Sequence, residues 1–453
     1  MNSKKIFILL SCLTLLVTLN FHPALAKEQI TFWTTEDEKD RVDIQKALAK
    51  TFEQKTGIQV QVIPVKENLL TQRITAAYAA NSLPDVVFHP IDHTIGWFEE
   101  KILDAKSATD LIKELGEKTF GQGPLNLIKV KNGYAAVPMD GWGQLLLFRK
   151  DLFEKEKLAV PDTWDHILKA AVKLHNPPLL WGFEAATDPG QVYTQQVFEH
   201  IALSNNVRLC DKKGNIRLNT PEMIETLQFY KKLASFTPPG NLYWLHTRMD
   251  YLSGRAAMII WSPFILDELS GLRKDQPVIP DIAQGKPGYL AQNTGFVSVI
   301  RGPKGAAQYG QINYLGITRD ADKEKAKKWV AYLLNEGYPK WLSMAAEGKL
   351  PVRKGDQDDP NRFIKQWMEL EFGVTTKAKI SQFYGMDTVK TIINGVDGFD
   401  RWGFAGGKGA LISKIYGTKA IPEILKKVLV GELTPQQGAE TMDKRVKALA
   451  SGQ

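Results

Sequence analysis

The sequence predicts an α/β protein made of two lobes that are joined by crossing segments. The chain has 453 residues, which is more than one ordinary domain holds. Strand and helix patterns alternate along residues 29–88, as they do in a parallel sheet covered by helices. An apolar run at 134–148, interrupted by Pro138, Gly141 and Gly143, indicates where the chain first crosses from one lobe to the other.

Residues 1–26 have the pattern of an export signal. Lys4 and Lys5 precede an apolar segment, residues 6–19, that is too short for a membrane-spanning helix. Ala24 and Ala26 supply the small side chains of a cleavage site. We therefore expect cleavage after Ala26, which releases residues 27–453 into the periplasm.

Charge and cysteine content exclude several classes of function. The formal net charge is +8, but the basic residues are scattered along the chain rather than gathered in one tract. This distribution is typical of a solvated surface, so we expect no nucleic-acid partner. Cys12 lies in the signal, and Cys210 is then alone, which leaves no partner for an intramolecular disulfide and no cysteine-based metal site.

The first lobe begins with strands and helices in alternation. We expect strands at 29–33, 58–65 and 85–88, and helices at 43–56 and 69–80. Apolar residues share one face of the first helix, and Gly57 ends it. This order predicts a sheet of parallel strands. In such sheets, ligands bind beyond the carboxyl ends of the strands. Side chains that follow Trp33 and Phe88 are therefore candidates for a site.

The second lobe combines longer helices with short apolar strands. We expect helices at 150–160, 164–175, 188–203 and 221–235, and strands at 179–183 and 254–261. A stretch rich in Pro and Gly at 279–293 then leads back to the first lobe, where a returning strand at 296–300 and an amphipathic helix at 322–335 follow. The remainder, 339–453, is mostly helical and is expected to pack on the second lobe. The first lobe is thus assigned to 27–138 and 288–335, and the second to 139–287 and 336–453.

Motifs of common enzymes are missing from the sequence. It contains no G-x-S-x-G elbow, no H-E-x-x-H, no phosphate-binding loop and no G-x-G-x-x-G after a strand. The glycine-rich stretch 403–409 lacks the spacing of a phosphate-binding loop, and a flexible loop is its simpler interpretation. We expect neither a catalytic activity nor a cofactor.

Acidic and aromatic residues at strand ends and crossings fit a site for a sugar or another polyol. Carboxylates, amides and Arg bind hydroxyl pairs, and aromatic faces cover the apolar patches of a sugar ring. The chain contains eleven tryptophans, which makes such faces plentiful. The candidate ligand-binding residues are Glu36, Asp37, His89, Asp92, His93, Asp140, Trp142, Asp188, Trp244, Trp261, Phe264, Arg353 and Trp402.

Several of these candidates have a structural alternative. Glu36 and Asp37 are also suited to the first turn of the helix that follows them. Asp92 has the position of a helix N-cap, and Trp261 ends an apolar strand in which core packing competes with ligand contact. Arg353 has the alternative of a plain surface charge.

The sequence resembles the extracellular solute-binding proteins of carbohydrate-uptake ABC transporters, the maltose-binding-like family. The likeness covers nearly the whole mature chain through motifs whose order and spacing are specific. These motifs are Thr31-Phe-Trp33, Phe52 to Val60 with Thr56-Gly57, Leu83-Pro-Asp85-Val-Val-Phe88, Pro161-Asp-Thr-Trp164, Gly254-Arg-Ala-Ala-Met258 and Leu350-Pro-Val-Arg353.

The resemblance implies a monomer with the bilobal fold of periplasmic binding proteins and hinge closure around a sugar held between the lobes. It implies delivery of that sugar to permease subunits of the inner membrane. Asp37, Asp92 and Phe264 match ligand positions of the family. His89 and His93 replace its usual aromatic residue and Arg, and Trp142 stands where maltose binders carry a carboxylate.

Within the family, the chain is similar to cyanobacterial binders of the compatible solute glucosylglycerol. This likeness implies a small glycoside as ligand, with sucrose and trehalose as related candidates. Two other classes stay open. A secreted glycosidase would need two carboxylates at catalytic separation. A metal-binding protein of the same shape would use His89, Asp92 and His93.

Overall fold

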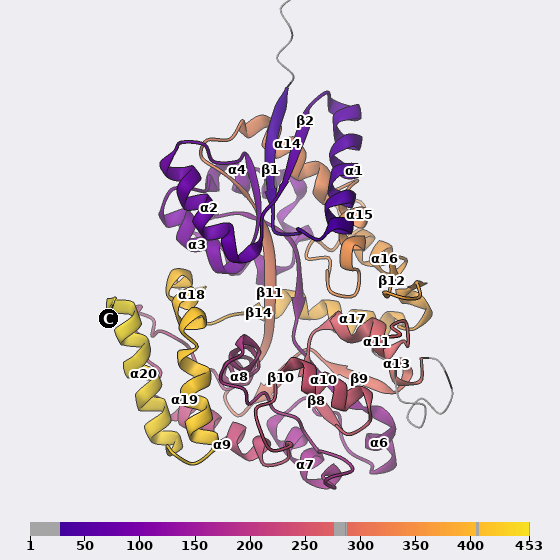
Figure 1. Ribbon diagram of the computed structural model, residues 1–453, viewed down its shortest axis with the longest axis vertical. Coiled ribbons are helices and arrows are strands. Elements are labelled where there is room, and N and C mark those ends of the chain that lie inside the picture. Colours follow the sequence, from indigo (N-terminus) through magenta and orange to yellow (C-terminus); the bar gives the residue numbers. More distant parts are fainter. Residues whose placement is uncertain (1–27, 276–285, 287, 405–406, 453) are drawn as a thin grey trace, which may run out of the picture.

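The computed structural model describes residues 28–275, 286, 288–404 and 407–452. The predicted signal segment and its cleavage site lie outside these residues. Figure 1 shows two groups of helices and strands stacked along the long axis of the molecule, with β11 (Gly305–Ile317) running between them. In the part of the chain that the structure describes, every helix is too short or too polar to cross a membrane.

The first sheet is built as the alternating pattern predicts. β1 (Gln29–Thr34) pairs in parallel with β2 (Gln59–Pro64) and β3 (Val86–Pro90). α1 (Lys39–Thr56) and α2 (Glu67–Ala79) connect these strands. Gly57 ends α1 with φ of 77°, a left-handed conformation that glycine adopts without strain. α3 (Ile91–Glu99) follows β3 directly, so Asp92 and His93 lie in its first turn.

The apolar run at 134–148 does connect two sheets. β6 (Val137–Gly143) pairs with β11 in the first sheet. β7 (Leu145–Arg149) pairs with β8 (Met258–Trp261) and β9 (Thr294–Val297) in a three-stranded sheet. Gln144 alone separates β6 from β7, so a single residue connects the two sheets at the first crossing.

The strand that returns to the first sheet is not the expected one. Residues 296–300 were expected to return, but β9 stays in the second sheet, and β11 pairs with β6 and β3 instead. Glycines and polar residues interrupt the apolar alternation of β11, which hid it in the sequence. The strand expected at 179–183 is also absent from the described residues, where Trp181 and Glu184 form isolated bridges to Ala256 and Ile259.

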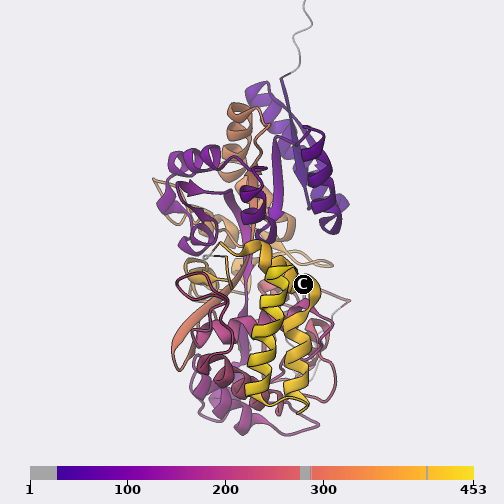
Figure 2. The same cartoon turned by 90° about the vertical axis from the view of Figure 1, so that its left-hand side faces the viewer.

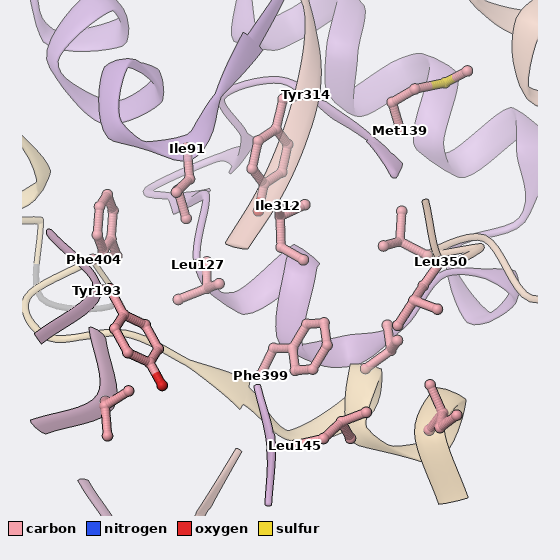
Figure 3. Packing of buried hydrophobic residues seen from close by; sticks show 14 of the residues in the cluster. Ile91, Leu127, Met139, Leu145, Tyr193, Ile312, Tyr314, Leu350, Phe399 and Phe404 are labelled. Carbon is pink, nitrogen blue, oxygen red and sulfur yellow. The ribbon is translucent and has the colours of Figure 1, made fainter. Parts of the chain in front are cut away.

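Two glycines let an aromatic ring lie across the crossing strands. Gly143 of β6 and Gly310 of β11 are partners in the ladder. A Cβ on Gly310 would lie 2.2 Å from the ring of Phe399, and one on Gly143 would lie 2.6 Å from it. Phe399 belongs to β14 (Phe399–Asp400), which pairs with β11. Figure 3 shows Phe399 between Leu145 and Ile312. The region where β6, β11 and β14 pair is called the waist of the molecule below.

Helices of the second half cover the second sheet and reach back to the first. α8 (Val192–Ser204) packs on β11, and α18 (Gly409–Thr418) packs on α3. α19 (Ala420–Leu429) and α20 (Pro435–Ser451) lie side by side along the outside of the lower half (Figure 2). The chain after residue 335 was assigned to the second lobe, yet α15 (Tyr338–Leu342) contacts α1 and α14 (Lys323–Leu334).

The remaining elements are shorter or lie farther from the waist. They are α4 (Ala105–Leu115), α5 (Gln122–Asn126), β4 (Lys129–Val130), β5 (Gly133–Tyr134), α6 (Lys150–Lys155), α7 (Trp164–Leu174), α9 (Pro221–Ala234), α10 (Trp244–Leu252), α11 (Leu266–Leu269), α13 (Tyr289–Asn293), β10 (Ile300–Gly302), α16 (Arg362–Met368), β12 (Glu371–Phe372), β13 (Ala378–Lys379) and α17 (Met386–Asn394). Thr220 caps α9, because its side chain accepts from the N–H of Met223.

Candidate ligand-binding cleft

Two cavities adjoin each other at the start of α8. They have volumes of about 540 and 500 Å³, and Val192 and Gln196 line both. They are therefore two ends of one cleft. The first, called the polar end below, is lined by Glu67, Asn68, Thr71, Pro90, Asp92, His93, Val192, Gln196, Gln311, Ser413 and Tyr416. The second, called the aromatic end, is lined by Trp142, Gly190, Gln191, Val192, Tyr193, Gln196, Trp244, Trp261, Ser262, Phe264 and Lys419.

The carboxylate of Asp92 is oriented by the crossing strand. Gln311 of β11 donates from Nε2 to Asp92 Oδ2 at 2.9 Å. Arg401 donates from Nη1 to Oε1 of the same Gln311 side chain. Because the amide oxygen accepts from Arg401, its NH2 group faces Asp92. The other oxygen of this carboxylate, Oδ1, lies 3.9 Å from Nη2 of Arg401. Ser413 of α18 donates to the backbone carbonyl of Asp92 at 2.7 Å.

A buried ion pair stands behind this network. Arg401 Nε lies 3.2 Å from Glu199 Oε1 on α8, and both side chains are fully buried. Tyr416 donates from its hydroxyl to Glu199 Oε2 at 2.7 Å, and the N–H of Trp402 donates to Oε1 at 2.8 Å. Burial raises the pKa of Glu199, although Arg401 and these donors oppose the shift. The pair connects α8, β11 and the segment after β14 to the first turn of α3.

Burial shifts the pKa values of His93 and Glu67 at the polar end. The ring of His93 stacks on Trp97, with centroids 4.8 Å apart. Burial lowers the pKa of His93, and the negative charge of Asp92 only partly opposes this. Desolvation raises the pKa of Glu67, and the charges of Asp92 and its acidic neighbours add to the rise. A neutral imidazole can donate and accept, which suits a hydroxyl ligand.

The aromatic end is formed by rings from β6, α8, α10 and β8. Trp244 begins α10 and Trp261 ends β8, and their rings stack with centroids 5.6 Å apart at 19°. Tyr193 of α8 meets Trp261 edge-on at 5.2 Å. Trp142, one of the candidates, comes from β6, so the first crossing also lines this end.

The structure places Glu36 and Asp140 together, but in a buried cluster outside both linings. Lys349 Nζ binds Glu36 Oε1 and lies 3.1 Å from Asp140 Oδ2. Arg41 holds the other oxygen of Glu36 at 2.7 Å. Burial alone would raise the pKa of Glu36, but the charges of Lys349 and Arg41 outweigh it and hold the pKa below its ordinary value. Trp341 donates to Asp140 at 2.6 Å.

Three further candidates are buried away from the cleft linings. His89 is fully buried, with Nδ1 2.9 Å from the carbonyl of Pro90, and burial lowers its pKa to about 3. Arg353 binds backbone carbonyls of Leu115 and Leu334 and is 2% exposed, so it is no surface charge. Trp402 is 1% exposed and donates to the carbonyl of Val207. These three side chains contribute to packing, and we do not include them in the proposed site.

The last two candidates lie in exposed or half-exposed loops. Asp37 is exposed after β1. Asp188 accepts from the N–H of Gly190 at 2.8 Å, and Gly190 lines the aromatic end. Neither carboxylate is part of a lining. Among the described residues, no three His, Cys, Asp or Glu side chains are placed to hold a metal ion.

Sequence reasoning missed most of the polar end. Glu67, Asn68 and Thr71 lie on the first turns of α2, Gln311 lies on the unrecognised strand β11, and Ser413 and Tyr416 lie on α18. The start of α2 follows β2, so the rule that ligands lie beyond strand ends could have found it. Arg401 and Glu199 gave no signal, because neither belongs to a motif.

Known proteins similar to this chain are bacterial transport proteins. Residues 35–338 match the model of a family described as bacterial extracellular solute-binding protein. The ABC transporter periplasmic-binding protein YcjN of Escherichia coli (strain K12) is 30% identical over 327 residues, which cover 71% of this chain and 72% of that protein.

Solved structures show the same fold at low sequence identity. The maltose-bound MalE3 of T. maritima has a TM-score of 0.65 at 20% identity and covers 93% of this chain and 99% of its own. The cyclic α-maltosyl-1,6-maltose binding protein of Arthrobacter globiformis has a TM-score of 0.70 at 14% identity and covers 94% of this chain and 99% of its own. A ribitol complex from Agrobacterium radiobacter K84 scores 0.60 at 20% identity and covers 93% of this chain and 98% of its own.

These neighbours are bilobal, and they confirm the predicted α/β architecture with two lobes. The family match and the E. coli relative together cover well over half of the sequence. The chain therefore belongs to the bacterial extracellular solute-binding proteins, which are transport components and not enzymes.

Proposed function

We propose that this chain is the substrate-binding component of an ABC importer and captures a small glycoside in the cleft. The observation that carries the proposal is the division of the cleft into a polar and an aromatic end. Each end has a volume of the order found for small-molecule pockets, about 300–1,000 Å³. A glycoside presents the same division, because its hydroxyls need polar partners and its ring has apolar faces.

The polar end offers hydrogen-bonding groups of both kinds. Asp92 accepts, Gln311 and Ser413 belong to the network that orients it, and the neutral imidazole of His93 can donate or accept. Because hydroxyls are both donors and acceptors, such a mixture fits a polyol better than a purely anionic or cationic ligand.

The aromatic end offers ring faces. Trp142, Trp244, Trp261 and Phe264 line it, and all four were candidates for contact with the ring of a sugar. Aromatic faces cover the C–H surface of a sugar ring and exclude water from it. We propose that the glycosyl ring lies at this end and that the second unit of the ligand reaches the polar end.

Glucosylglycerol is the ligand that we put first, with sucrose and trehalose as related candidates. Its glucosyl ring suits the aromatic end, and its glycerol unit suits the hydroxyl partners around Asp92. What supports this choice is the two-part shape of the cleft together with the likeness noted from the sequence. The solved neighbours named above include complexes with maltose and with ribitol, so the choice among glycosides rests on the test below.

Capture is proposed to work by a shift in population between open and closed forms. The lobe that contains β1, β2 and β3 and the lobe that contains β7, β8 and β9 would meet around the ligand. Walls of the polar end come from α2 and α3 on one side and from α8 and α18 on the other. A ligand that contacts both sides stabilises the closed form. We propose that the exported monomer delivers its ligand to permease subunits of the inner membrane.

The test is calorimetric titration of the chain without residues 1–26. The ligands are glucosylglycerol, sucrose, trehalose, maltose, glucose and glycine betaine, each with and without EDTA. We expect saturable binding of one glycoside that EDTA does not change. Binding that requires a metal, or no binding of any sugar, would refute the proposal.

A pair of tryptophan variants links binding to the cleft. Trp261→Ala removes a ring of the aromatic end, and we expect at least a tenfold weaker affinity, because stacking and burial of the ring are lost. Trp181→Ala is the matched control, since Trp181 is half-buried and lies outside both linings. Equal affinities of the two variants would contradict the placement of the site.

A further inference from the structure

A charged pair lies directly behind the aromatic end. Arg248 follows Trp244 by one turn of α10, and its guanidinium carbon lies 4.8 Å from the centroid of the Trp244 ring. Arg248 is 9% exposed, and its Nη1 lies 2.9 Å from Oε1 of Glu268, which is fully buried. Glu268, Arg248, Trp244 and Trp261 therefore follow one another in contact, from the interior to the cleft lining.

The two indole rings are held from several sides. Arg248 covers Trp244, Trp261 stacks on Trp244, and Tyr193 meets the edge of Trp261. Tyr193 is itself fixed, because its hydroxyl donates to the carbonyl of Ile260 at 2.6 Å. Tyr243 contacts Trp244 at 89°, with centroids 5.8 Å apart. Rings packed in this way lose little further freedom when a ligand binds, which is how preorganisation favours affinity.

Stability alone does not explain a charged pair behind the Trp244 ring, because both charges lose their hydration when they are buried. Buried ion pairs contribute little net stability, and apolar residues of similar volume can replace them without loss. In the described structure, Nε of Arg248 and the Glu268 oxygens make no well-directed hydrogen bond, although Nη1 of Arg273 lies 3.7 Å from Oε1 of Glu268 as a second cation. A cation over an indole face, however, fixes that ring and occupies the face that another cation would seek.

We propose that Arg248, anchored by Glu268, is a positioning residue that holds Trp244 and Trp261 as a preformed platform and reserves it for an uncharged ring. The inference rests on the proposed function, because it assigns a role within the same cleft. Clusters of Trp and Tyr otherwise attract quaternary ammonium groups. Here the charge of Arg248 behind the platform and Lys419 in the lining disfavour such a ligand.

The first test needs no ligand. Closely stacked indoles couple their transitions, so the near-ultraviolet circular dichroism of the ligand-free protein should contain a couplet that Trp244→Phe removes. Arg248→Met keeps the apolar stem and removes the charge, and we expect it to weaken the couplet by at least half. Arg248→Lys should restore most of it. Arg255→Met is the matched control, because Arg255 pairs with Asp250 of α10 and does not cover Trp244.

Folding is monitored by far-ultraviolet circular dichroism, and Glu268→Gln provides a second variant if Arg248→Met does not fold. Glu268→Gln removes the anchor and keeps the side-chain shape, so it should weaken the same couplet. In the Trp244→Phe background, Arg248→Met should change the spectrum no further. An unchanged couplet in Arg248→Met, or in Glu268→Gln when Arg248→Met cannot be purified, would overturn the inference.

The second test uses binding of trehalose, sucrose, glucosylglycerol and choline. Whichever glycoside binds the wild type should bind Arg248→Met three- to tenfold more weakly, and Arg248→Lys close to normally. Choline should not bind the wild type, and its binding there would overturn the claim of an uncharged ring. If no glycoside binds the wild type, the proposed function fails, while the couplet still decides whether Arg248 positions the platform.

Discussion

The two ends of the cleft are held in place by different means. At the polar end, Asp92 of α3 is connected through Gln311 and Arg401 to Glu199 of α8, so its geometry depends on elements from both halves of the molecule. At the aromatic end, Trp244 and Trp261 are stacked within one half. If the lobes close around the ligand as proposed, the platform would exist before closure, whereas the polar end would be completed when the halves come together.

Among the substitutions considered, replacing Arg401 at the polar end should cause the largest loss of stability. Arg401→Met leaves Glu199 buried without its cation, and breaking a buried pair in this way costs about 3–5 kcal/mol in the free energy of unfolding. Urea denaturation measures the change. Lys39→Met is the control, because Lys39 and Asp43 form an exposed ion pair, and exposed pairs contribute little to stability. A loss below 1 kcal/mol in Arg401→Met would show that the network does not hold the polar end.

The two ends should also respond to pH in opposite directions. His200 neighbours Glu199 behind the polar end, and burial lowers its pKa from 6.5 to about 4. Its contribution to stability is present above pH 6.5 and is lost as the pH falls towards 4. Glu184 lies beneath the aromatic end, where burial and then Asp250 raise its pKa from 4.5 to about 10. Its contribution is present below pH 4.5 and is lost as the pH rises towards 10.

Replacing each group by Gln should flatten opposite limbs of the stability curve. One titrating group changes the unfolding free energy by about 1.4 kcal/mol per pH unit within its window. His200→Gln should reduce the slope between pH 6.5 and 4, and Glu184→Gln should reduce it between pH 5 and 9. Denaturation midpoints across pH 4–9 measure both. Parallel curves for the two variants would contradict the contrast between the ends.

Asp92 and Asp37 test which carboxylate binds hydroxyls. Asp92→Asn replaces a charged acceptor at the polar end, and loss of a hydrogen bond to a charged group costs about 1.5–3 kcal/mol, or roughly 10–100-fold in affinity. Asp37 is exposed and outside both linings, so Asp37→Asn should change affinity less than about twofold. Calorimetry with the best glycoside compares them. A larger effect at Asp37 would favour the carboxylate after β1 as the partner of the ligand hydroxyls.

The sequence predicted the aromatic end better than the polar end, for a physical reason. Trp142, Trp244, Trp261 and Phe264 all lie in the lining, because rings of this size either pack in the core, as Trp402 does, or cover the wall of a cavity. Polar residues carry no such signal. Arg353 and Arg401 are both buried, yet Arg353 binds backbone carbonyls far from the cleft, and Arg401 stands behind its wall.

The fold shows the same division between local and distant signals. β1 to β3 and the helices between them follow from alternation of residues near in sequence. β11 could not be predicted in this way, because three glycines and several polar residues break its apolar alternation. Its position is determined by pairing with β3 and β6, which lie more than a hundred residues earlier in the chain. Gly310 has a reason that only the tertiary structure shows: the ring of Phe399 occupies the space beside it.

Substitution of Gly310 is expected to have the smallest effect on stability. It tests whether the polar and the aromatic end both depend on the waist, where Gly310 lies. Gly310→Ala places a Cβ 2.2 Å from the ring of Phe399, and such overpacking costs about 1–3 kcal/mol. Gly417→Ala is the control, since its Cβ would meet nothing within 4 Å. If only the polar end depends on the crossing strands, Gly310→Ala should weaken glycoside binding and leave the indole couplet of the aromatic end unchanged. Loss of the couplet as well would mean that both ends depend on the waist, and the platform would not be preformed.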